Sequence, residues 1–432
     1  MTVPAVGIIA AVFVGVLAAS RLRVPLGWAL TAGGILLDVF AGARAGDVAA
    51  HVRDAALSWR LWLLVVVVGL MVEFCRAMTR PDNVGSLVAA LTRWGGRHGR
   101  AWALMLVPAV IGTLPLPGGA LFSAPFVQHA ASGTPVWTAD WKTAVNYWFR
   151  HVLEFWWPLY PGVIVALSLF KLEPWRIVGT QWVFTPLAML VGYAVLIRPH
   201  RRELADVRPE GGGANRRAWF LGALLLTVVG CALLLPPLMA RGLPSMAVEN
   251  RKLVAVIAGL VVASLAILID ERRTGEGVLF RGGLSRESRR ILPTVAGVMM
   301  FQSLLRASGL IDSACREMAA WGIPPVCAVA LLPFLAGLVT GIAVGFTGTA
   351  FPLVVEMMDR SGGDLTPLAT FALAFGFGHA GMMLSPVHVC LVATSDFFSS
   401  SMRKTLRLLL PCVGFMLAMA ILVYVCLTAL GL

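Results

Sequence analysis

The stretch from residue 149 to 158 reads FRHVLEFWWP, and the stretch from 377 to 386 reads FGHAGMMLSP. Aligned, the two share a histidine and a proline: His151 falls on His379, and Pro158 falls on Pro386. Further matches lie upstream: Pro108 and Gly112 with Pro333 and Gly337, and Pro125 with Pro352. Two copies of a unit with glycine and proline breaks at matching places are typical of secondary transporters.

Composition indicates that lipid surrounds the chain. Of its 432 residues 58% are hydrophobic and 13% are charged, and the mean hydropathy is +0.83. A water-soluble domain of this size lacks the interior for so many apolar side chains, so we expect a multi-pass membrane protein. The net charge of +13 comes largely from arginines in short loops between apolar runs, and membrane topology explains them. We therefore expect no nucleic-acid partner.

About ten apolar segments are long enough to cross a bilayer as helices. They lie near 3–20, 24–40, 61–79, 141–170, 174–197, 218–240, 251–269, 291–308, 364–397 and 404–430. The first could be taken for a signal peptide, but Arg21 and Arg23 follow the apolar run instead of preceding it. We expect this segment to be retained as a span.

Two further apolar segments, 101–131 and 324–358, are interrupted. The first contains GTLPLPGG at 112–119, and the second contains GIAVGFTGT at 341–349. Non-helical backbone at membrane depth is tolerated only where protein or a wet cavity surrounds it. We interpret both segments as re-entrant helical hairpins that enter and leave on the same side. Two kinked full spans are the alternative.

Arginine placement sets the topology. The loops 198–217 and 270–290 carry six arginines each, so we place both in the cytoplasm and the chain in the inner (cytoplasmic) membrane. Segment 61–79 then runs inward and segment 291–308 runs outward, which makes the two repeats inverted. The expected fold is an all-α polytopic membrane protein with about ten spans and two hairpins in two inverted repeats.

The same reading divides the chain into four parts. These are N-terminal scaffold helices (1–60), repeat 1 with its hairpin (61–197), linker loops and central helices (198–290), and repeat 2 with its hairpin (291–432). In each repeat, a stretch that is polar on one side precedes the hairpin, at 81–100 and 309–323. Both stretches resemble short helices that lie in the membrane interface.

Charged residues recur in the first repeat. Asn146, Arg150 and Glu154 follow each other every four residues, so a helix presents them on one face with His151 close by. Ionisable groups at membrane depth are costly and usually face a cavity or each other. One interpretation makes Glu154 and His151 a proton or cation site beside an anion-attracting Arg150. The other is an Arg150–Glu154 ion pair that only fixes helix packing. Pro158 and Pro161, which should unwind the helix one turn later, favour the first.

In the second repeat, His379, Ser385 and His388 line the matching segment, where small residues can equally indicate close helix packing. The two histidines are nine residues apart, which gives no metal-ligand spacing on a helix, and the seven cysteines include no C-x-x-C pair. We therefore expect no metal site, and no cofactor beyond the H⁺ or Na⁺ that would drive transport.

The interruptions of the two hairpins add candidate binding groups. Backbone N–H groups at the start of a returning half-helix suit an anion. The residues in question are Pro117, Gly118, Gly119 and Ser123 in the first hairpin, and Thr347, Gly348 and Thr349 in the second. Glu73, Glu356 and Asp396 lie near predicted helix ends, where we expect interfacial anchoring.

Three stretches resemble a known membrane family: LPGGALFSAP at 116–125, NYWFRHVLEFWWPLYPG at 146–162 and LSPVHVCL at 384–391. The family is domain of unknown function four-zero-one, grouped with the ion-transporter superfamily of gluconate, citrate and dicarboxylate permeases. The resemblance implies inverted repeats, paired hairpins, a homodimer and elevator-like movement. Sodium-dependent dicarboxylate members carry Ser-Asn-Thr at the hairpin tips, whereas here the tips read Pro-Gly-Gly and Phe-Thr-Gly-Thr.

The expected function is secondary transport of a small, anionic solute across the bilayer, coupled to H⁺ or Na⁺, and not enzymatic catalysis. An ion channel is one alternative. An intramembrane hydrolase that uses Ser123 or Ser385 with a histidine is another, although no G-x-S-x-G occurs in the chain.

Overall fold

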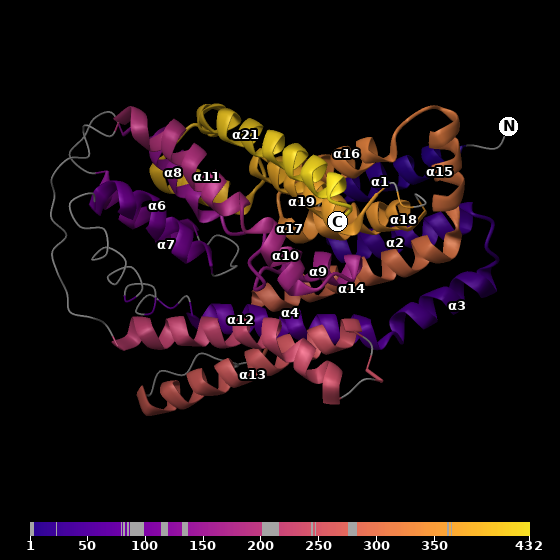
Figure 1. Cartoon of the computed structure of the whole chain (residues 1–432), viewed down its shortest axis with the longest axis horizontal. Helices are drawn as coiled ribbons and strands as arrows, with labels where there is room; N and C mark the ends of the chain where they lie inside the picture. The colour runs from indigo at the N-terminus through magenta and orange to yellow at the C-terminus, as the bar shows by residue number, and fades with distance from the viewer. Residues whose placement is uncertain are drawn as a thin grey trace.

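The computed structural model describes residues 4–22, 24–78, 80, 83, 86, 99–113, 120–131, 137–200, 216–242, 245–246, 248–274, 283–360, 363 and 365–432. Within these ranges all regular structure is helical, and no strand occurs (Figure 1). The all-α expectation is confirmed for this part of the chain.

Six stretches of helix are long and apolar enough to cross a membrane. They are α4 (Trp59–Met78), Pro174–His200, α12 (Arg216–Gly242), Asn250–Arg272 within α13 (Val248–Thr274), α14 (Arg286–Ser308) and α21 (Met402–Ala429). The stretch 174–200 contains α10 (Pro174–Gln181), α11 (Phe184–Gly192) and the π-helical turn η2 (Tyr193–Ile197). These spans make the chain a multi-pass membrane protein.

The other four expected spans are shorter or broken. α1 (Ala5–Arg21) and α2 (Leu26–Phe40) cover the two N-terminal segments. Segment 141–170 divides into α8 (Ala139–Arg150) and α9 (Pro161–Phe170). Segment 364–397 divides into α19 (Pro367–Met383) and α20 (Val389–Phe398). We call residues 151–160 the first break and residues 384–388 the second break.

The first break begins earlier than the sequence suggested. Helix α8 ends at Arg150, more than two helical turns before Pro158 and Pro161, so Glu154 lies in a turn and not on the helical face expected for it. The reason is local. The His151 ring nitrogen Nδ1 hydrogen-bonds to the carbonyl of Tyr147, which would accept a backbone amide if the helix continued. The amide of Glu154 instead bonds the carbonyl of His151 at 3.2 Å.

The two interrupted segments form several short helices. The first contains α6 (Gly99–Gly112) and α7 (Ala120–Ala130), which pack together. The second contains α16 (Pro325–Thr340), α17 (Ala343–Thr349) and α18 (Phe351–Arg360). Helix α16 ends at Gly341, whose φ of 63° is left-handed and therefore suits glycine.

Glycines let several helices approach until their backbones touch. A Cβ at Gly112 would overlap the carbonyl oxygen of Arg150, and a Cβ at Gly337 would overlap that of Gly378. A Cβ at Gly381 would overlap the carbonyl oxygen of Phe334, where α19 packs on α16. The small residues of α19 thus serve close packing, which was one of the two interpretations open from the sequence.

Buried polar contacts tie α4 to α14. Near the end of α4, Glu73 Oε1 accepts the amide of Ser285 at 2.7 Å and the hydroxyl of Ser288 at 2.6 Å. Its Oε2 pairs with Arg76 at 3.0 Å. Because Ser285 is the N-cap of α14, the end of α4 meets the start of α14, and the two packed helices run in opposite directions.

Helix α15 (Leu310–Ala320) packs against α1 and lies at a steep angle to it, as Figure 1 shows. Its Glu317 accepts the amides of Ala5 and Val6 at 2.8 and 2.9 Å and so caps α1. The companion stretch 81–100 falls almost entirely outside the described residues. The sequence reading missed a further short helix, α3 (Ala45–Ala56), whose His51 pairs with buried Asp38 at 2.8 Å.

Candidate functional site

The two broken helices meet. Near the end of α8, the Tyr147 hydroxyl donates to the carbonyl of Met383 at 3.3 Å, where α19 ends. One residue earlier, the side-chain amide of Asn146 donates to the carbonyl of Ala120 at 2.9 Å and to the hydroxyl of Thr394 at 3.3 Å. The side chains of α8 thus connect the first interrupted segment with both α19 and α20.

The carboxylate of Glu154 lies at the centre of this junction. Its Oε1 is 4.0 Å from Arg150 Nη1 and 3.8 Å from His151 Nε2, and its Oε2 is 4.0 Å from His379 Nε2. All four side chains are buried, with Glu154 only 6% exposed. One carboxylate therefore faces a guanidinium and two imidazoles that come from both halves of the chain.

The imidazoles are held by their surroundings and not by Glu154. His151 Nδ1 lies 2.5 Å from the carbonyl of Tyr147, which fixes this ring as a donor on that side. The His379 ring packs tilted on Phe155, with centroids 4.1 Å apart. Among the described residues, neither Nε2 atom finds a hydrogen-bond partner. Buried polar atoms left in this way are unusual and mark a place where a ligand can bind.

Tyr160 connects the first interrupted segment to the same site. Its hydroxyl donates to the carbonyl of Gly112, at the end of α6. The side chains of Arg150 and Glu154 lie near this hydroxyl. The end of α6 is thus fixed against the first break.

The second interrupted segment lies against the second break in a comparable way. A Cβ at Gly341 would come within 2.9 Å of the His388 amide and of the Ser385 hydroxyl.

Two hydroxyls that we expected to bind a ligand instead bond backbone carbonyls of their own segment. Thr347 donates to the carbonyl of Ala343 at 2.9 Å, and Thr349 donates to that of Gly345 at 2.7 Å.

His388 brings α20 to the cluster. It is the N-cap of α20, because its Nδ1 accepts the amide of Cys390 at 3.1 Å. The rings of Tyr147, His151 and His388 pack edge-on or tilted, with centroids 4.7 to 5.1 Å apart. The sequence argument about a metal site compared His388 with His379, nine residues away. The imidazole that packs against His388 is instead that of His151.

Residues 35–212 and 237–427 match the family described as Protein of unknown function (DUF401). The chain belongs to the DUF401 family. A search of curated proteins finds no match.

Several of the predicted site residues of this DUF401 protein do not join the cluster. Ser123 donates to the carbonyl of Ala120 at 3.1 Å, within its own helix. Gly348 packs against Val298, away from Glu154. Pro117, Gly118 and Gly119 lie outside the described residues.

The three carboxylates expected to be interfacial anchors differ in their contacts. Glu73 holds the start of α14, Glu356 pairs with Arg306 at 2.5 Å, and Asp396 is exposed.

Three residues of the DUF401 cluster were not anticipated as site residues: Tyr147, Tyr160 and Cys390. One signal was available for the tyrosines, because the chain has only four and two of them flank Glu154. Cys390 gave none, since an isolated cysteine in an apolar helix usually fills space.

Proposed function

We propose that this DUF401 protein is a secondary active transporter that moves a small, anionic solute across the cytoplasmic membrane, coupled to H⁺ or Na⁺. The observation that carries the proposal is the position of Glu154, which lies between Arg150 and the two imidazoles where two broken helices meet. Transporter sites are built in this way, because a broken helix offers backbone groups and side chains at membrane depth.

Antiparallel first helices support two inverted repeats. α4 opens the first repeat and α14 opens the second, and Glu73 ties the end of one to the start of the other. The glycine contacts add independent support. Gly112 abuts the carbonyl of Arg150, and Gly337 abuts that of Gly378, so matching glycines touch matching carbonyls in the two copies.

The interrupted segments support paired hairpins. In the second copy α17 packs against α9, and in the first copy α7 packs against α20, so each returning helix contacts the broken helix of the other copy. In Figure 1, α6 and α7 lie toward the end of the molecule where α12 begins, and α15 and α18 lie toward the opposite end. Hairpins that open from opposite sides of the membrane would have this arrangement.

Contacts at the helix ends support the cytoplasmic assignment. Arg217 and Asp270 form an ion pair between the start of α12 and the end of α13. The two arginine-rich loops therefore leave the membrane domain at the same end, and the positive-inside rule places that end in the cytoplasm.

The site suggests a division of roles. The buried guanidinium of Arg150 attracts the anionic solute, and Glu154 holds the coupling cation between His151 and His379. Alternating access would move the two breaks and the hairpins as a unit against α1, α2, α12 and α13. We propose a homodimer, as in the transporter superfamily that the chain resembles.

A hydrolase receives no comparable support. In the described contacts, the Ser123 hydroxyl donates within its own helix, and the Ser385 hydroxyl accepts the amide of Val387 at 3.4 Å. Neither hydroxyl bonds a histidine side chain there, as an activated nucleophile would. A channel, the remaining alternative, is separated from a transporter by experiment.

The test is solute flux into proteoliposomes. A thermal-shift screen of organic acids, amino acids and oxyanions, with and without Na⁺, first identifies a solute that stabilises the protein. Uptake of that solute should saturate and should respond to an imposed pH or Na⁺ gradient. A current that rises linearly with voltage and ignores both gradients would instead indicate a channel.

A further inference from the structure

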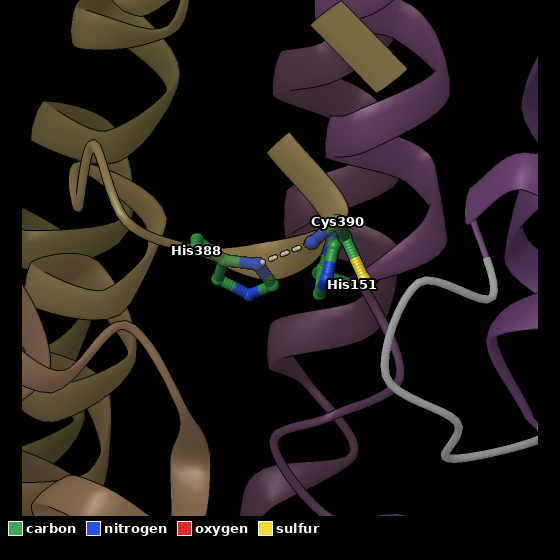
Figure 2. A group of neighbouring side chains, drawn as sticks. All are labelled: His151, His388 and Cys390. Atoms are coloured by element: carbon green, nitrogen blue, oxygen red, sulfur yellow. Dashed lines mark hydrogen bonds between the residues drawn. The ribbon is translucent and has the colours of Figure 1, made fainter. Parts of the chain in front are cut away.

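We propose that His151, His388 and Cys390 form a binding site for a thiophilic transition-metal ion of the Zn²⁺ class. One ligand atom from each residue lies within 4.8 Å of the others, and all three side chains are buried. Figure 2 shows the three side chains converging, with His151 approaching from the α8 side and the other two from the start of α20. The site goes beyond the proposed transport function, although it shares His151 with the Glu154 cluster.

His151 is oriented as metal-binding histidines are. Its Nδ1 contacts the carbonyl of Tyr147 at 2.5 Å, which places the proton on Nδ1 and leaves the lone pair on Nε2. A backbone carbonyl bonded to the far ring nitrogen is the usual outer-shell partner of a histidine ligand. Among the described residues this Nε2 has no hydrogen-bond partner, so a metal ion would satisfy a buried atom.

His388 can join the ion only at the expense of its capping bond. Its Nδ1 accepts the amide of Cys390 at 3.1 Å, so in the neutral ring Nε2 carries the proton. Coordination through Nδ1 breaks this bond. Coordination through Nε2 shifts that proton to Nδ1, which can then no longer accept the amide. Cys390 loses a proton, because the thiolate is the ligand. Binding therefore releases at least one proton, goes with a change at the start of α20, and strengthens as the pH rises.

The donor set selects the class of ion. Two imidazoles and one thiolate suit Zn²⁺ or Cu⁺, whereas Mg²⁺ and Ca²⁺ require oxygen ligands. Glu154 supplies the nearest carboxylate, with Oε1 3.8 Å from His151 Nε2. Its negative charge and that of the thiolate offset a divalent ion in a buried setting beside Arg150.

Ring packing alone also brings these residues together. Tyr147, His151 and His388 contact one another edge-on or tilted, as aromatic side chains do without any ion. The thiol distinguishes the two cases, because a cluster held only by ring packing does not depend on the sulfur of Cys390.

The test uses the purified full-length protein, stripped with a chelator and dialysed against Zn²⁺, with Cu⁺ and Mg²⁺ in parallel. Bound metal is measured by mass spectrometry. We expect one Zn²⁺ or Cu⁺ per chain and no Mg²⁺. Cys390→Ser, His151→Gln and His388→Gln should each weaken binding at least about tenfold. Cys412→Ser, at a buried cysteine on α21, and His200→Gln serve as matched controls and should leave binding unchanged.

Co²⁺ gives a measurement that does not depend on the folding of the variants. The wild-type protein with Co²⁺ should show a thiolate-to-cobalt charge-transfer band that persists in Cys412→Ser. Absence of this band, no stoichiometric Zn²⁺ or Cu⁺ in the wild type, or equal affinity in Cys390→Ser and Cys412→Ser would each overturn the proposal. Metal binding is measured without solute flux, so a protein that fails to transport can still bind zinc.

Discussion

Glu154 of the first break and His379 of α19 face each other across the two halves of the chain, with Oε2 and Nε2 4.0 Å apart. The distance is longer than a hydrogen bond, and the His379 ring packs on Phe155 instead. In the function that we propose, the coupling cation binds between these two groups. This relationship motivates the first two predictions.

Glu154→Gln should abolish gradient-driven uptake while the protein still folds. Glutamine has the same size but cannot carry the negative charge that faces Arg150 and the two histidines. Uptake into proteoliposomes measures the loss, and size-exclusion chromatography checks the fold. The matched control is Asp396→Asn, an exposed carboxylate on α20, which should keep full uptake. Normal uptake by Glu154→Gln would remove this residue from the mechanism.

His379→Gln should impair uptake but leave Zn²⁺ affinity unchanged. His379 faces Glu154 but is not among the three proposed metal ligands. Flux and metal binding measured on the same preparation test both statements. If this variant lost both Zn²⁺ binding and uptake, the two proposed sites would be a single site.

Zn²⁺ should inhibit uptake in the wild type, and Cys390→Ser should relieve the inhibition. An ion held by His151, His388 and Cys390 links α8 to the start of α20, so it would prevent the two breaks from moving apart. Initial uptake rates across a zinc titration measure the effect, with Cys412→Ser as the control. Equal inhibition of both variants would place the inhibitory zinc elsewhere.

Gly112→Ala and Gly337→Ala should each lower stability by about 1–3 kcal/mol, the usual cost of overpacking. In both, the new methyl group would overlap a backbone carbonyl that has little room to move. Thermal unfolding of the purified variants measures the loss. Gly230→Ala on α12, where a Cβ meets nothing within 4 Å, is the matched control and should be neutral. Unchanged stability in both test variants would contradict the close approach.

Glu73→Ala should destabilise the protein by about 1–3 kcal/mol, because the Ser285 amide, the Ser288 hydroxyl and Arg76 would lose an acceptor. Glu287→Ala, at an exposed site in the first turn of α14, should have a much smaller effect. Thermal unfolding again provides the measurement. If the two variants behaved alike, the tie between α4 and α14 would add nothing to stability.

Sequence reasoning found the long spans and the interruption at Gly341, because both depend on local composition. It also found His151, Arg150 and Glu154 by their spacing, although the helix ends before Glu154 and a turn brings these groups together. The earlier end was not predictable, because it depends on a ring that competes for the Tyr147 carbonyl. Hydrophobic periodicity and the positions of prolines contain no information about that competition.

The rest of the cluster depends on contacts between distant parts of the chain. Cys390 meets His151 only because α20 returns to α8, and no local pattern marks that return. The metal argument from sequence considered the ligand spacing on one helix only. It did not extend to ligands from both halves of the chain. The short helix α3 was missed for another reason, since its polar composition lacks an apolar run.

The contacts of Gly112 and Gly341 have one further consequence. The first interrupted segment packs on the end of α8, and the second packs on the second break, both too closely for an added side chain. Tyr160 adds a hydrogen bond to the first of these contacts. Neither segment can swing open on its own without separating surfaces that fit at the level of the backbone. In a transporter of the kind that we propose, the gate would therefore be the movement of the two breaks and both interrupted segments together, and not a hinged flap over a fixed site.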